Sequence, residues 1–66
     1  MTVTVNGQTA ALDEGATILA MLTQRGYVPE RVVVEHNRAI VDRSHWSEKV
    51  ISSGDEIEVI AFLGGG

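Results

Sequence analysis

The stretch EIEVIAFL, residues 56–63, predicts the strand around which the rest of the chain is arranged. One face of that strand carries only apolar side chains: Ile57, Val59, Ala61 and Leu63. On the opposite face Glu58 is followed by two apolar residues, Ile60 and Phe62. Strands that are apolar on much of both faces are typical of the middle of a sheet. We therefore expect residues 56–63 to form a central strand.

Residues 1–12 have the pattern of a β-hairpin. Met and Val alternate with Thr in residues 1–5, and this period of two is typical of a half-buried strand. Asn6-Gly7 follows, and both residue types tolerate the positive φ angles of a type I′ turn. We expect residues 8–12 to return antiparallel to the first strand.

Residues 18–25 are expected to form the main helix. Thr17 can cap its N-terminus. The apolar stripe at helical spacing consists of Ile18, Leu19 and Leu22. Met21 lies beside this stripe and is expected to fill the core. Gly26 can end the helix in a left-handed conformation, and Pro29 prevents the helix from continuing.

The segment between the helix and the last strand is divided into short elements. RVVVEH, residues 31–36, is rich in β-branched residues and predicts an inner strand. NRAIV, residues 37–41, predicts a turn and a brief strand, and DRSHW, residues 42–46, a loop or a single helical turn. EKVI, residues 48–51, is expected to form a short edge strand, followed by a turn at SSGD, residues 52–55.

The predicted order of elements is hairpin, helix, strand, small elements and a long final strand. A hairpin that leads into a crossover helix, with the last strand inserted beside the first, is the β-grasp arrangement. We therefore expect an α+β fold with a mixed sheet, one main helix and one domain over residues 1–63. Residues 64–66 are expected to form a flexible tail that projects from the central strand.

The composition excludes several classes of function. The chain has 66 residues, a formal charge of −4 and no cysteine, which excludes a thiolate zinc site and a cysteine nucleophile. No basic patch is visible, so we expect no nucleic-acid partner. No apolar run approaches the ~18 residues of a membrane span, so we expect no membrane association and a cytoplasmic location. The acidic surface could meet a basic partner or serve solubility.

Few side chains outside the C-terminus suggest chemistry. His36 and His45 are interpreted as ordinary surface or half-buried histidines, because a metal site would need further ligands at suitable spacing. The carboxylate pairs at 13–14 and 55–56 fall in predicted turns, where acidic residues are common. Trp46 is expected to cover the small core, and a contact with a partner is the alternative. We expect no metal site.

The three glycines at 64–66 are the strongest candidate for a working segment. Chain ends are often disordered, and a frayed terminus is the alternative interpretation. The glycines directly follow the predicted central strand, however, without the polar residues of a flexible linker. Three extended residues span at most about 10 Å, which is enough to carry a carboxyl group down a narrow channel. Because glycine lacks a Cβ, the walls of such a channel can close around the backbone.

The whole chain resembles a known family. Asn6-Gly7, the segment VVVEHNRAIVDRSHW at residues 32–46 and the ending GDEIEVIAFLGGG at residues 54–66 look like the ThiS family of sulfur carriers in thiamine biosynthesis. This resemblance implies a ubiquitin-like β-grasp fold. It also implies that the protein is a co-substrate and not an enzyme, with no bound cofactor of its own, and we expect a monomer when it is free.

The resemblance also implies a mechanism at the C-terminus. Gly66 is expected to be adenylated by a ThiF-like adenylating enzyme, which uses ATP, while Gly65 occupies the channel of that partner. A persulfide enzyme is expected to supply sulfur, giving a thiocarboxylate that a ThiG-like thiazole synthase receives. Gly64 is an additional glycine, since many relatives have only two, and it is expected to lie with Gly65 on the partner-binding segment. Phe62, Leu63 and part of the Ile60 face are the expected docking patch, with plain sheet packing as the alternative.

Three rival functions remain open at this level. The first is a sulfur carrier for molybdopterin or another product, although those relatives tend to be longer and often have prolines before their glycines. The second is a ubiquitin-like modifier that is joined to lysines. The third is a passive β-grasp interaction domain.

Overall fold

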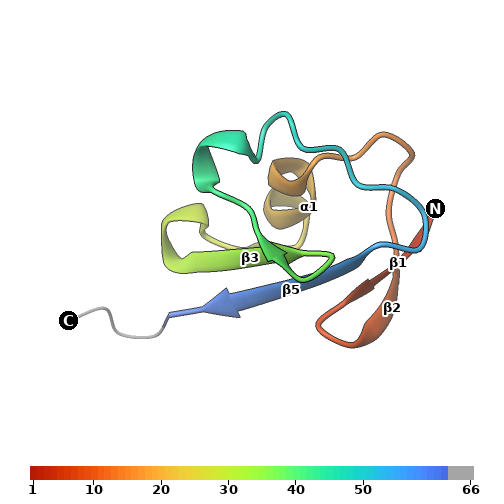
Figure 1. The fold of residues 1–66 in the computed structure, drawn as a ribbon, viewed down its shortest axis with the longest axis horizontal. Coiled ribbons are helices and arrows are strands. Elements are labelled where there is room, and N and C mark those ends of the chain that lie inside the picture. Colours follow the sequence, from red (N-terminus) through yellow and green to blue (C-terminus); the bar gives the residue numbers. More distant parts are fainter. Residues whose placement is uncertain (63–66) are drawn as a thin grey trace.

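The computed structural model describes residues 1–62, and this part of the chain forms a five-stranded mixed sheet. The strands are β1 (Thr2–Val5), β2 (Gln8–Ala11), β3 (Val32–His36), β4 (Ala39–Ile40) and β5 (Glu56–Ala61). Their order across the sheet is β2-β1-β5-β3-β4. As predicted, β5 is central, with β1 parallel on one side and β3 antiparallel on the other (Figure 1). The β-grasp prediction is confirmed.

The predicted hairpin and helix are both present. Asn6 and Gly7 connect β1 to β2 with φ angles of 51° and 79°. Helix α1 (Ile18–Gln24) begins after Thr17, whose hydroxyl oxygen accepts a hydrogen bond from the Ala20 N–H at 3.1 Å. Gly26 follows the helix with a φ of 81°, so the left-handed end is also confirmed.

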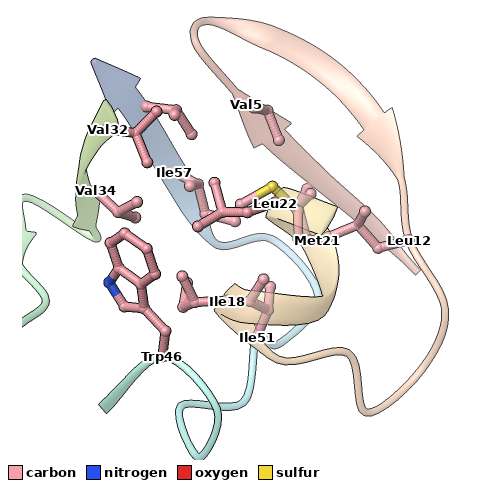
Figure 2. Packing of buried hydrophobic residues seen from close by; sticks show 12 residues of the cluster. Val5, Leu12, Ile18, Met21, Leu22, Val32, Val34, Trp46, Ile51 and Ile57 are labelled. Carbon is pink, nitrogen blue, oxygen red and sulfur yellow. The ribbon is translucent and has the colours of Figure 1, made fainter. Parts of the chain in front are cut away.

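Helix α1 covers one face of the sheet and forms the core with it (Figure 2). The helix buries Ile18, Met21 and Leu22 completely, whereas Leu19 is only partly buried. The predicted stripe is therefore displaced: positions i, i+3 and i+4 share one side of a helix, and this places Met21 in the stripe and Leu19 at its edge. The sheet contributes mainly valine and isoleucine: Val3, Val5, Val32, Val34, Ile57 and Val59.

Trp46 closes the core beside α1. It follows the short helix η2 (Arg43–His45), which confirms the predicted helical turn, and it is only 2% exposed. Figure 2 shows the Trp46 ring among the core side chains. Its indole Nε1–H donates a hydrogen bond to the Val41 carbonyl at 3.0 Å, which satisfies the polar atom of a buried ring. The prediction that Trp46 covers the core is confirmed.

The predicted edge strand at residues 48–51 is wrong. Only Val50 forms a β-bridge there, with Thr17. The backbone pairs just twice with the residues around the start of α1: the Ile18 N–H donates to the Lys49 carbonyl at 2.9 Å, and the Ile51 N–H donates to the Ala16 carbonyl at 2.8 Å. Pairing cannot extend further on this side because the Lys49 N–H already donates to the His45 carbonyl and closes the turn that follows η2.

Two further differences concern the ends of elements. Pro29 does more than stop α1, because it starts the short helix η1 (Pro29–Arg31) that leads into β3. Strand β5 ends at Ala61, earlier than the predicted residue 63. The second face of β5 is not buried in the described residues: Glu58 and Ile60 are exposed. Among residues 1–62 no helix has the length and apolar character needed to cross a membrane.

Candidate functional site

Strand β5 leads to the candidate site at the C-terminus. On the edge of β5 that faces β1, the side chain of Asn6 from the first hairpin holds the strand in place. Val5, the last residue of β1, pairs with Ile57, so the β1–β5 ladder stops there. The Asn6 N–H then donates to the Ile57 carbonyl at 2.8 Å, and the Asn6 amide oxygen accepts from the Val59 N–H at 2.7 Å. Asn6 thus replaces a missing strand residue and satisfies a backbone donor of β5.

The start of β5 is held by three polar side chains. His36 lies at the end of β3 and is buried, and its Nε2 is 2.6 Å from Oδ2 of Asp55. Asn37 has a φ of 51°, donates from its amide to Asp55 Oδ1 at 3.2 Å and accepts the Glu56 N–H at 2.8 Å. These contacts join the β3–β4 turn to the first residue of β5.

The electrostatics of Asp55 fix the proton on His36. Partial burial raises the pKa of Asp55, but hydrogen bonds from the Ser52 N–H, His36 and Asn37 outweigh it and hold the pKa below its ordinary value. Asp55 is therefore an ionised carboxylate at neutral pH and can only accept hydrogen bonds. It follows that Nε2 of His36 carries a hydrogen and donates a hydrogen bond to Asp55 Oδ2.

The far end of β5 presents two of the predicted docking residues to solvent. Ile60 is 49% exposed and lies on the sheet face opposite α1, across from Val33 on β3. Phe62 is 53% exposed. Its N–H donates to the carbonyl of Arg31, the residue before β3, at 2.7 Å, so the hydrogen bonding between β5 and the β3 segment continues one residue past the end of β5. Neither side chain is packed inside the core, which argues against the alternative of plain sheet packing.

The remaining predicted site residues lie outside the described part of the chain: Leu63, Gly64, Gly65 and Gly66. The prediction of a flexible tail, and the assignment of the adenylated carboxylate to Gly66, fall on these residues. The C-terminal end of β5, which leads to these residues, points away from the N-terminus and from the β1–β2 turn (Figure 1).

The described residues hold one larger hollow, but it does not resemble a catalytic site. This hollow, about 640 Å³, lies between β4 and the segment after η2, and its wall includes His36, His45 and Lys49. His36 is already bonded to Asp55. Residues 1–62 contain no group of three or more His, Cys, Asp or Glu side chains arranged to hold a metal ion.

Comparison with known proteins identifies the family. The model of the ThiS family matches residues 3–66, which is nearly the whole chain. The chain belongs to the ThiS family. ThiS proteins are the sulfur carriers of thiamine biosynthesis, so the resemblance noted in the sequence is confirmed at the level of the family.

A solved ThiS structure supports the fold. The crystal structure of the thiamine biosynthesis protein ThiS from Geobacter metallireducens has a TM-score of 0.84 and 30% identity, with each chain covered completely. A solution structure of a thiamine biosynthesis protein from the same organism has a TM-score of 0.82 and 30% identity, and covers 100% of this chain and 88% of its own.

Two curated relatives are much longer than the ThiS unit. The chain is 38% identical to a thiazole synthase of Magnetococcus marinus and 33% identical to one of Paramagnetospirillum magneticum. All 66 residues are aligned in both cases, but they span only 20% of each relative's length.

Sequence reasoning missed the polar side chains that hold β5. The sequence pattern assigns Asn6 only to a turn, whereas its bond to Val59 joins residues 53 positions apart. The same pattern predicts a turn carboxylate at Asp55 and an ordinary histidine at His36. One local signal was present: Asn37 follows His36 directly, and asparagine at a strand end is suited to the left-handed conformation and to backbone hydrogen bonding.

Proposed function

We propose that the chain is a sulfur carrier whose Gly66 carboxylate is adenylated, converted to a thiocarboxylate and used as the sulfur source for the thiazole ring of thiamine. The observation that carries this proposal is the ThiS family match over residues 3–66, which includes the glycines beyond β5. The central position of β5 supports it, because a strand held on both sides gives the following residues a fixed origin.

The proposed chemistry begins with a poor electrophile. A C-terminal carboxylate has a pKa of about 3.3–3.7 and is ionised at neutral pH. An adenylating enzyme of the ThiF type uses ATP to form an acyl-adenylate on Gly66 and releases pyrophosphate. A persulfide sulfur then attacks the carbonyl carbon, AMP leaves, and reductive cleavage of the S–S bond by a thiol leaves the thiocarboxylate.

The carrier contributes a reacting atom and a recognition surface, and the partners contribute the catalysis. The adenylating enzyme supplies the ATP site, a persulfide enzyme supplies sulfur, and a thiazole synthase of the ThiG type accepts it. Two thiazole synthases among the relatives contain a stretch that aligns with this whole chain, and this supports the choice of acceptor. No cofactor of its own is required for this role.

Intact-mass measurement tests the proposal. The protein is incubated with the adenylating enzyme, ATP and a sulfur source, with a reaction lacking ATP as the control. Exchange of one oxygen for sulfur, only when ATP is present, is the expected result. Attachment to another protein would instead indicate a modifier, and an unchanged mass would favour a passive interaction domain.

A further inference from the structure

The buried histidine in the wall of the hollow beside β4 uses only one of its two ring nitrogens. The side chain of His36 is 7% exposed, and its Nε2 donates to Asp55 Oδ2 at 2.6 Å. Because Nε2 carries the hydrogen, Nδ1 of the neutral ring has a free lone pair and can only accept a hydrogen bond. Within residues 1–62, the bond to Asp55 is the only hydrogen bond of the His36 side chain.

The free Nδ1 of His36 reaches the hollow. In the part of the chain that the structure describes, no buried side-chain nitrogen or oxygen lacks a hydrogen-bond partner. Nδ1 has no such partner, so it must touch open space, and the space that His36 lines is the hollow of about 640 Å³. A polar atom of an otherwise buried side chain can accept a hydrogen bond there from a bound molecule.

Negative charge is in excess in the wall of the hollow. Asp42 and Glu48 contribute two carboxylates, whereas Lys49 contributes one ammonium group. None of these three groups forms an ion pair with another residue of the described range 1–62. Hydrogen bonds from the Ser44 hydroxyl and N–H hold the pKa of Asp42 below its ordinary value, so this carboxylate is charged at neutral pH. The wall therefore favours a positively charged ligand.

Apolar side chains from β4 and the residue after it form another part of the wall: Ala39, Ile40 and Val41. Ile40 is 71% exposed, so it offers apolar surface to a ligand. Sites for small molecules are typically concave, have volumes of about 300–1,000 Å³, and combine apolar walls with a few polar groups that fix the orientation of the ligand. The hollow has each of these properties.

We propose that the hollow binds a small organic cation, an amidinium or ammonium group on an apolar body, whose N–H donates a hydrogen bond to Nδ1 of His36. A metal ion is not the favoured ligand, because residues 1–62 contain no group of three or more His, Cys, Asp or Glu side chains arranged to hold one. The site is separate from the proposed reactive end: His36 pairs with Ile57 near the start of β5, whereas Phe62 follows the other end of that strand. The proposal goes beyond the carrier function and does not depend on it.

The test uses benzamidine as the probe, because it carries a planar amidinium group on an apolar ring. Benzyl alcohol has a similar ring without a charge, and benzoate has a negative charge instead. Each compound is titrated into the full chain at low salt, and NMR follows the backbone amides and the ¹⁵N resonances of the histidine rings. Benzamidine is expected to bind saturably and to shift both His36 Nδ1 and the amides of residues 39–49. Binding should be weaker for benzyl alcohol and absent for benzoate.

A pair of variants tests the charge of the wall. Glu48→Gln removes one carboxylate from the hollow, and Glu58→Gln is the matched control, because Glu58 is an exposed glutamate of β5 that does not line the hollow. Glu48→Gln is expected to weaken benzamidine binding by about two- to fivefold at low salt, the range of an exposed ion pair, and by less at high salt. Glu58→Gln should bind like the parent. The contribution of His36 is measured from its ring resonance and not from a substitution, since the same ring holds Asp55.

Three results would overturn the proposal. The first is the absence of saturable benzamidine binding, which would mean that the hollow is open surface only. The second is equal or tighter binding of benzoate, because Lys49 would then outweigh the two carboxylates. The third is benzamidine binding that leaves His36 Nδ1 unshifted or that is the same for Glu48→Gln and the parent. Each of these results leaves the carrier function standing, because thiocarboxylate formation is measured separately by intact mass.

Discussion

The side-chain amide oxygen of Asn6 accepts a hydrogen bond from the backbone N–H of Val59 at 2.7 Å, across 53 positions of sequence. The contact lies just beyond the end of β1, where β5 would otherwise have an unpaired donor on that side. Asn6 thereby combines two functions: it adopts the positive φ of the turn and extends the ladder along β5. Because β3 pairs with the other edge of β5, the strand that leads to the proposed reactive end is held on both sides.

Replacement of Asn6 by alanine is expected to lower the free energy of unfolding by about 1–3 kcal/mol, because the Val59 N–H loses its partner in a partly buried place. Alanine is also less suited to the positive φ at this position. Asn6→Asp retains a side-chain acceptor and tolerates the same backbone conformation, so it should be closer to the parent. Urea denaturation measures both variants, and equal losses for Ala and Asp would contradict the role of the acceptor.

Val59→Asp is expected to unfold the domain. Val59 is 7% exposed and belongs to the core, and an unpaired carboxylate there costs several kcal/mol, close to the total of roughly 3–10 kcal/mol available to a chain of this size. Glu58→Asp keeps a carboxylate on the exposed face and is expected to be almost silent. Circular dichroism distinguishes the two. Similar spectra and melting temperatures would mean that the faces of β5 are assigned incorrectly.

Asp55→Asn should make stability less dependent on pH in the acid range. The lowered pKa of Asp55 means that the carboxylate stabilises the fold above its unfolded pKa of about 3.9 and that this contribution is lost as pH falls through the folded value. At pH 7 the variant is expected to be less stable by about 1–3 kcal/mol, because charge-assisted hydrogen bonds are lost. The difference between parent and variant should shrink as pH falls below about 4. A constant difference across that range would contradict the role of Asp55 as an ionised acceptor of hydrogen bonds.

Local patterns were sufficient to predict most of the fold. The alternation in β1, the apolar residues that predict a strand within 56–63, the Asn6-Gly7 turn and the Thr17 cap all act between near neighbours in sequence. The structure confirms the two strands, the turn and the cap. The strand expected at residues 48–51 failed for a different reason. Its β-branched and apolar residues suit a strand, but the preceding turn uses the Lys49 N–H, and only Val50 reaches a partner.

The polar contacts of the candidate site could not be predicted in the same way. The His36–Asp55 and Asn6–Val59 bonds join residues 19 and 53 positions apart, and each depends on the strand order that brings β1, β3 and β5 together. Ile60 and Phe62 were predicted as docking residues from their place beside the glycines, and the structure places both at the surface. Their engagement by a partner stays a prediction.

Gly65→Ala is expected to keep the fold and to slow activation severely. The proposed channel of the adenylating enzyme encloses bare backbone, so the added methyl group has no room beside it. Melting temperatures equal to those of the parent, together with a large loss of thiocarboxylate formation by intact mass, are the expected results. Conversion at the parental rate would show that the channel does not enclose this residue.

The most direct test of the central claim is ATP–pyrophosphate exchange by the adenylating enzyme with the parent and with a variant that lacks Gly66. Removal of Gly66 withdraws the carboxylate from the adenylation centre by about 3.3–3.6 Å, one extended residue. A misplacement of about 1 Å can already cost a hundredfold in rate, so we expect exchange with the parent and none above background with the variant, at equal melting temperatures. Exchange by the shortened variant at the parental rate would contradict the account, because Gly66 would then not be the residue that is activated.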